Sequence, residues 1–157
     1  MAISYLQEVL PSAVKNRPGC ADLFTGLGVS FDAFMAKISN AVALDGTTSR
    51  ASYNAYMLGH GGRGRNDQTV SQVFSDPSVT AKSSWRYNEI YFRPAYLTPE
   101  TLAHEVFHKM LSSSTGNYLW DDDLMEFLKG SPFTSPQFNP NGKSEEFSKE
   151  FKRRCLD

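Results

Sequence analysis

Residues 98–111, TPETLAHEVFHKML, constrain the fold more than any other stretch, because they carry several independent signals of a helix start. Thr98 can cap the first turn with its hydroxyl oxygen, and Pro99 stands at the first helical position, where its missing N–H costs nothing. Glu100 brings a negative charge to the positive end of the helix dipole. We therefore predict a short helix that begins at Thr98 and ends near residue 111.

This helix carries a polar face beside an apolar stripe. His104 and His108 are four residues apart, so they lie about one turn from each other on the same face. Both imidazoles can therefore reach one metal ion, which is the arrangement of the HExxH zinc motif. Glu105 is placed to accept a proton from a metal-bound water instead of ligating the metal. The alternative interpretation is an ordinary amphipathic helix that exposes two histidines and a glutamate.

Two histidines do not complete a catalytic zinc site, which usually has three protein ligands and a water molecule. No cysteine is near in the sequence, so the third ligand is expected to be a carboxylate from the acidic run after the helix. Asp121 is our first choice, Asp123 the second, and Glu126 a further alternative. An aspartate of this run can also cap the helix that follows, and the two roles are compatible because the metal needs only one carboxylate.

Residues 104–108, HEVFH, followed by an acidic residue downstream, resemble the zincin metallopeptidases over about residues 88–130. The metzincin continuation, HExxHxxGxxH, is absent, because Leu111 stands in place of its glycine and Ser114 in place of its third histidine. The chain is more similar to the aspzincin style, in which an aspartate after a glycine-containing turn is the third ligand. It does not reproduce the GTxDxxYG signature of that family.

The resemblance implies a zinc-dependent peptidase that hydrolyses peptide or protein substrates. Zinc would activate a water molecule and polarise the scissile carbonyl, with Glu105 as the general base. The oxyanion needs a further donor, for which Tyr96, Tyr118 and His60 are the candidates. The alternatives are a zincin-shaped metal-binding or interaction domain without peptidase activity, a hydrolase of a non-peptide amide, and a proteolytic toxin or effector domain of a larger polypeptide.

The composition is that of one folded domain. With 157 residues, of which 40% are hydrophobic, the chain can bury a sizeable core, and we expect a single zincin-like domain over residues 1–157. The expected fold class is α+β, with a small sheet, an active-site helix and flanking helices. A net charge of −1, with both signs interspersed, argues against nucleic acid and anionic membranes as partners. The sequence has no apolar run of membrane-spanning length, and we expect a monomer.

The first twenty residues lack a basic segment followed by an apolar core, so we expect no secretory signal in this sequence. A signal or a larger upstream region can nevertheless be absent from this sequence, so secretion or export of the protein stays an open alternative. Cys20 and Cys155, the two cysteines of the chain, lie near opposite ends. They can form a disulfide in an exported protein or stay reduced in the cytosol. The sequence alone is compatible with both states.

Two helices are expected in the first third of the chain. The first has apolar residues at helical spacing until Pro11 disturbs the pattern, and the Arg-Pro-Gly of residues 17–19 ends it. The second begins at Ser30 or Asp32 and keeps an apolar face as far as Leu44, with the following Asp-Gly pair as its end.

Short extended pieces are expected before the metal helix. Aromatic and β-branched residues predict strands at 51–58 and 85–92, and 69–74 fits either a short strand or a helical turn. In zinc peptidases a strand near the metal helix commonly lies along the cleft, where its edge can bind an extended peptide. The strand at 85–92 is the candidate for this position.

Three segments are expected after the metal helix. Residues 112–117 predict a turn, and a short apolar helix follows the acidic run. Residues 144–154 predict a last helix, with Phe147 and Phe151 four residues apart. We expect this helix to lie on the surface, docked by the two phenylalanines.

Overall fold

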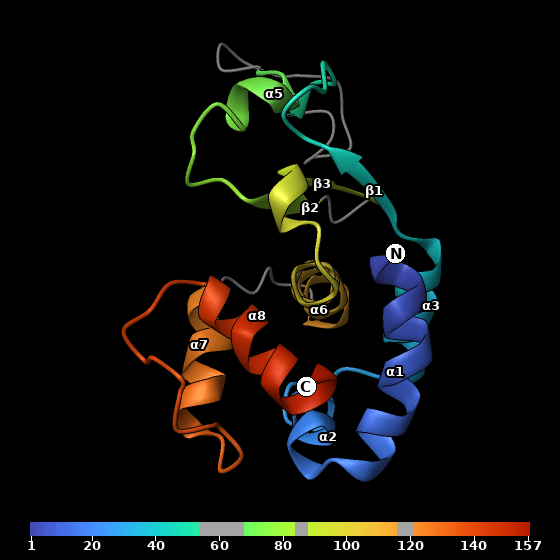
Figure 1. The fold of residues 1–157 in the computed structure, drawn as a ribbon, viewed down its shortest axis with the longest axis vertical. Coiled ribbons are helices and arrows are strands. Elements are labelled where there is room, and N and C mark those ends of the chain that lie inside the picture. Colours follow the sequence, from blue (N-terminus) through green and yellow to red (C-terminus); the bar gives the residue numbers. More distant parts are fainter. Residues whose placement is uncertain (54–67, 84–87, 116–120) are drawn as a thin grey trace.

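Helix α6 (Pro99–Thr115) lies at the centre of the molecule, with other helices beside and below it and a small sheet above it in the view of Figure 1. The computed structural model describes residues 1–53, 68–83, 88–115 and 121–157. The other elements, in chain order, are α1 (Ala2–Asn16), α2 (Pro18–Thr25), α3 (Phe31–Asn40), β1 (Val42–Asp45), α5 (Val70–Val73), β2 (Ala81–Ser83), β3 (Glu89–Phe92), the 3-10 turn η1 (Pro94–Tyr96), α7 (Asp121–Gly130), α8 (Glu145–Phe151) and the π-helical turn η2 (Lys152–Leu156). Over the described residues, seven α-helices and one three-stranded sheet confirm the expected α+β class.

Helix α1 continues through Pro11, where the sequence pattern was expected to be disturbed. A proline inside a helix leaves the carbonyl four residues earlier without its N–H partner. Pro11 and Gln7, which carries this carbonyl, are both exposed, so water can take the place of the missing donor. The other face of α1 buries Leu6, Leu10 and Ala13, and this packing holds the helix in place.

Ser30 caps α3, as its position in the sequence predicts, because its hydroxyl oxygen accepts a hydrogen bond from the Ala33 N–H at 3.3 Å. The helix ends at Asn40, however, and the chain continues as β1, so the prediction of a helix as far as Leu44 is wrong. Strand β1 pairs in parallel with β3, and these hydrogen bonds between distant segments override a local pattern that suits a helix.

The sheet has the strand order β1-β3-β2, with β1 parallel and β2 antiparallel to the central strand β3. Ile90 and Phe92 of β3 belong to the main core. Tyr91 lies between them in the sequence and packs instead with Val70 and Phe74, because successive side chains of a strand point to opposite faces. The sheet therefore joins the main core to a smaller apolar cluster.

Strand β3 confirms the end of the strand predicted at 85–92. The beginning of that strand, and most of the strand predicted at 51–58, lie outside the described residues. The segment 69–74 contains α5, a helical turn that starts with a capping box between Thr69 and Gln72. Strand β2 was not predicted from the sequence.

Helix α6 starts where its sequence predicts, because Thr98 Oγ1 accepts a hydrogen bond from the Thr101 N–H at 3.3 Å. It continues to Thr115, so the turn predicted at 112–117 does not begin at residue 112. Phe107 packs its ring against Phe24 and Phe34 in the main core, with ring centroids 5.1 and 4.8 Å away. This packing fixes the rotation of α6, and with it the direction of the histidine face.

Helix α8 is largely buried, so the prediction of a surface helix docked by two phenylalanines is wrong. Phe147 and Phe151 enter the core as expected, but Glu146, Ser148 and Glu150 are buried as well. Buried polar side chains need partners inside the protein, and those of α8 have them.

Glu150 is the centre of an ionic cluster with two arginines, one of which, Arg154, also lies 3.6 Å from the carboxylate of Asp22. Arg154 Nε donates to its Oε2 at 3.0 Å, and Arg153 Nη1 donates to its Oε1 at 3.1 Å. The backbone N–H and the hydroxyl of Ser135 donate to the same carboxylate. Burial raises the pKa of Glu150, but these hydrogen bonds lower it by more, so the pKa lies below its usual value of 4.5.

Cys20 of α2 and Cys155 of η2 form a disulfide, with their Cα atoms 5.0 Å apart. Of the two states that the sequence left open, the structure has the oxidised one. The bond ties the second helix to the last turn of the chain, across a sequence separation of 135 residues.

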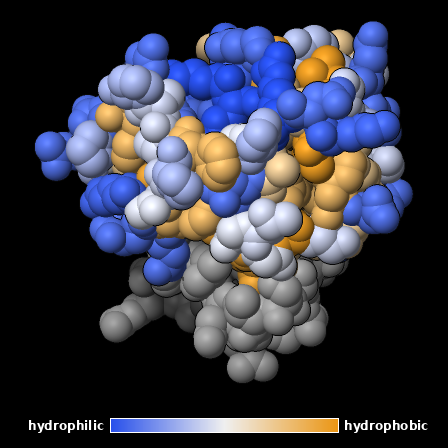
Figure 2. Space-filling model, turned by 90° about the horizontal axis from the view of Figure 1, so that it is seen from below, coloured by the Kyte–Doolittle hydropathy of each residue, from blue (hydrophilic) through white to orange (hydrophobic). Residues whose placement is uncertain are grey.

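Among the described residues, no helix is both long and apolar enough to cross a membrane. Seen from the α2 end, hydrophobic side chains reach the surface in separate patches between hydrophilic ones (Figure 2). This mixed surface agrees with the interspersed charges of the sequence.

Candidate metal centre

Helices α6 and α7 bring together the three side chains that the sequence proposes as metal ligands. His104 Nε2 lies 3.2 Å from His108 Nε2, and Asp121 Oδ1 lies 3.0 Å from the first and 2.7 Å from the second. The histidines come from successive turns of α6, and Asp121 is the first residue of α7. Three atoms with electron pairs to donate therefore converge on one point.

The two histidines and the aspartate differ in their exposure. His104 and His108 are almost fully buried, whereas the side chain of Asp121 keeps 48% of its surface exposed. Burial raises the pKa of Asp121, but hydrogen bonds to His104 and His108 lower it by more, so its pKa lies well below the usual range. The carboxylate is thus ionised, which a metal ligand requires.

The donor set fits zinc in kind and in spacing. Zinc in proteins is bound by imidazole nitrogen and carboxylate oxygen, and a tetrahedral site with bonds of about 2.0–2.1 Å keeps its ligand atoms about 3.3 Å apart. The three distances between ligand atoms here, 2.7–3.2 Å, are shorter than this by about 0.1–0.6 Å. The order of the ligands along the chain also suits a zinc site. Two histidines come from one helix and the carboxylate comes from the next helix.

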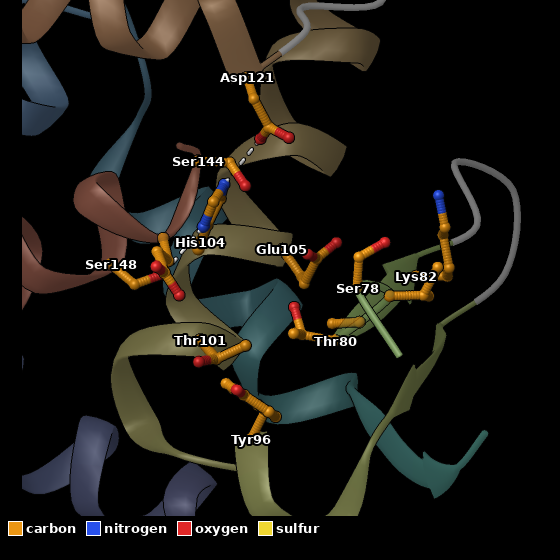
Figure 3. A pocket seen from close by; sticks show the side chains of 13 residues that line it. Ser78, Thr80, Lys82, Tyr96, Thr101, His104, Glu105, Asp121, Ser144 and Ser148 are labelled. Atoms are coloured by element: carbon orange, nitrogen blue, oxygen red, sulfur yellow. Dashed lines mark hydrogen bonds and ion pairs between the residues drawn. The ribbon is translucent and has the colours of Figure 1, made fainter. Parts of the chain in front are cut away.

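A cleft with a volume of about 280 Å³ lies beside these ligands. Glu105 lines it, between His104 on one side and Ser78 and Thr80 on the other (Figure 3). The cleft walls come from the segment before and within β2, from η1, from α6 and from the start of α7 and α8: Ser78, Val79, Thr80, Ala81, Lys82, Tyr96, Thr101, His104, Glu105, Asp121, Ser144, Glu145 and Ser148. The candidate ligands His104 and Asp121 therefore border a cleft that solvent can enter.

The strand along this cleft is β2, not the predicted strand 85–92. Strand β3, which forms the described part of that segment, has a neighbour on each side and so cannot offer an edge. Strand β2 stands at the end of the strand order, and its Ala81 and Lys82 line the cleft. Strand β2 could not be predicted, because its three residues are too few to show an alternating pattern.

The alternatives for the third ligand lie elsewhere. The convergent group consists of His104, His108 and Asp121, and neither Asp123 nor Glu126 belongs to it. Glu126 instead accepts a hydrogen bond from Lys129 Nζ at 2.9 Å on the exposed side of α7. Asp121, the first residue of α7, is the one whose carboxylate lies within hydrogen-bond distance of both histidines of α6.

Of the proposed oxyanion donors, Tyr96 lines the cleft and is partly exposed. Tyr118 and His60 lie outside the described residues. Tyr96 belongs to η1, the 3-10 turn directly before α6, so it lies close in sequence to the helix with the two histidines.

Lys109 adds a positive charge to α6 directly after His108. Burial and the neighbouring Lys37 together lower its pKa to about 8, while Glu89 and Glu105 oppose the change. At neutral pH the Lys109 side chain is therefore mostly protonated. Its positive charge interacts electrostatically with the carboxylate of Glu105.

Sequence reasoning missed one polar residue at the centre, Ser148 of α8. Its Oγ lies 2.9 Å from His104 Nδ1, the ring nitrogen that faces away from the convergent group. The signal available was indirect: Phe147 was predicted to dock, and Ser148 is its neighbour. Nothing local in the sequence connects Ser148 with a histidine 44 residues earlier.

Comparison of the chain with models of known families, with curated proteins and with solved structures gave no match. Overall similarity therefore assigns neither a family nor an activity. The functional argument depends on the local arrangement of His104, His108 and Asp121 beside a cleft that also holds Glu105.

Proposed function

We propose that this protein is a zinc-dependent metallopeptidase of the zincin type, with His104, His108 and Asp121 as zinc ligands and Glu105 as general base. One observation carries the proposal: three suitable ligand atoms converge next to a cleft into which the adjacent glutamate also faces. An ordinary amphipathic helix has no reason to bury both histidines against a carboxylate from another helix.

The chemistry follows from the positions of the side chains. A bound zinc ion would supply a Lewis acid that polarises a carbonyl and lowers the pKa of a water molecule. Glu105 would act as the general base: from its place on the cleft wall it could accept a proton from a water molecule and pass it to the leaving amine. Tyr96 is the described candidate for a hydrogen bond to the oxyanion.

A peptide in extended conformation suits the cleft because β2 forms one wall. An outer strand can pair with the backbone of such a peptide, while alternate side chains of the peptide enter pockets. The supporting fact is the antiparallel pairing of β2 with β3, which leaves β2 at the end of the sheet.

The test begins with the metal content of the purified protein, for which we expect one zinc ion per chain. Glu105→Gln removes the base and keeps the size of the side chain, so it should keep the zinc. Hydrolysis of a library of quenched fluorescent peptides should fall by about 10²–10⁴-fold, the usual contribution of a general base.

The matched control is Glu100→Gln, a glutamate on the first turn of the same helix that is not part of the cleft wall. It should keep both zinc and activity. A wild-type protein without zinc, or a Glu105→Gln variant with full activity, would contradict the proposal. Zinc binding without hydrolysis of any peptide would favour the alternative of a metal-binding domain without peptidase activity.

A further inference from the structure

Two consecutive residues of α8 hold the imidazole of His104. Ser148 Oγ lies 2.9 Å from His104 Nδ1, and the Phe147 ring packs against the imidazole with centroids 5.2 Å apart and planes tilted by 53°. Ser148 lines the cleft and keeps only 7% of its surface exposed. In Figure 3 the Ser148 hydroxyl lies on the opposite side of the ring from Asp121.

The hydrogen bond bears on the position of the imidazole proton. A neutral imidazole carries one proton, and a nitrogen that binds metal must be the unprotonated one. When the proton is on Nδ1, that N–H donates to Ser148 Oγ, and Nε2 is left with its electron pair facing His108 and Asp121. Without the hydroxyl, a proton on Nδ1 would lose its protein acceptor on a histidine that is only 5% exposed, which destabilises the tautomer that carries it.

We infer that Ser148 is a positioning residue of the candidate metal centre: its hydroxyl oxygen accepts the Nδ1–H of the His104 tautomer that would bind zinc through Nε2, and so holds that ring in place. This inference rests on the proposed zinc site and names the residue outside the ligand set that prepares it. Phe147 supports the same role by limiting the tilt of the ring. The last helix of the chain thereby takes part in metal binding without supplying a ligand.

The first experiment measures zinc affinity by competition with a chromophoric chelator. Ser148→Ala removes one oxygen atom and should weaken zinc binding by about 10–100-fold, as loss of a hydrogen-bond partner behind a ligating histidine typically does. Ser148→Thr keeps a hydroxyl and should restore the affinity. The matched control is Ser83→Ala, a serine of β2 that is equally buried but does not line the cleft, and it should bind zinc as the wild type does.

The second experiment uses the wild-type protein and does not depend on the folding of a variant. Imidazole ¹⁵N NMR of the zinc-loaded protein should show the His104 proton on Nδ1, in slow exchange with water. A proton on Nε2 would overturn the inference, because Nδ1 would then be the ligating atom.

The two proposals fail in different ways. If wild-type protein binds no zinc, the proposed function fails and takes this inference with it. If wild-type protein binds zinc and Ser148→Ala binds it equally well, only the role of Ser148 is refuted.

Discussion

Two buried polar clusters lie within a few residues of each other on α8, and they differ in how their charges are balanced. The cluster around Glu150 contains a carboxylate and two guanidinium groups, so donors match acceptors. The cluster around His104 brings two imidazole nitrogens and a carboxylate oxygen to one point, so electron-pair donors face one another. The first arrangement is complete in itself, whereas the second is what a cation needs.

The difference teaches how to separate structural from functional polar groups by their geometry alone. Burial alone does not distinguish the clusters, because both contain side chains with almost no exposed surface. Access to solvent does distinguish them. A cleft borders His104 and Asp121, whereas Glu150 has no exposed surface. We therefore expect changes in the first cluster to affect metal binding, and changes in the second to affect the free energy of unfolding.

The largest effect is expected for Asp121→Ala. Loss of one of three ligands should lower zinc affinity by more than the roughly 10–100-fold that follows from losing a partner behind a ligand. Isothermal titration with zinc measures the change, and Asp123→Ala, two residues further along the same helix, should bind zinc like the wild type. Unchanged zinc binding by Asp121→Ala would remove the basis for calling this cluster a metal centre.

The next effect concerns the other cluster. Glu150→Ala leaves the buried Arg154 with only the more distant carboxylate of Asp22, at 3.6 Å, and breaking a buried ion pair typically costs about 3–5 kcal/mol of unfolding free energy. Urea denaturation in the presence of a chelator isolates this effect from zinc binding. Glu126→Ala breaks the exposed pair with Lys129 and should change the unfolding free energy by only about 0–1 kcal/mol.

If Glu150→Ala proved as mild as Glu126→Ala, the ionic cluster would not be the structural element that we describe. A loss of zinc affinity in Glu150→Ala, with the fold intact, would show that the two clusters are coupled through α8.

The smallest effect is a change in how stability depends on pH. The pKa of Glu150 is lowered in the folded protein, so at acid pH the unfolded chain binds more protons than the folded one, and stability rises with pH. The stabilisation is fully present above the usual pKa of 4.5 and is lost as pH falls towards the folded value. Denaturation curves between pH 3 and 7 should therefore be less pH-dependent for Glu150→Gln than for wild type, and equal curves would contradict the lowered pKa.

The parts that sequence could predict depend on neighbours within a few residues. The cap at Thr98 and the spacing of His104 and His108 are properties of one helix, so they can be read directly. Asp121 was a first choice among three carboxylates because it follows the helix after a turn, and the structure places it beside both histidines.

The parts that sequence could not predict depend on distant segments. The residues of β1 continue a helical pattern and become a strand only because β3 pairs with them. Strand β2 has three residues and owes its position to the same partner. Ser148 reaches His104 across 44 residues, and no periodicity in the sequence records such a contact.

The bond between Cys20 and Cys155 makes the chain between them a covalent loop. A protease that cuts a single peptide bond anywhere inside this loop would produce two fragments that remain one molecule, with α6 and α8 still attached to each other. Such a nicked protein would migrate as intact chain on a gel until it is reduced. Under oxidising conditions a single cleavage event would therefore not release either half of the metal centre.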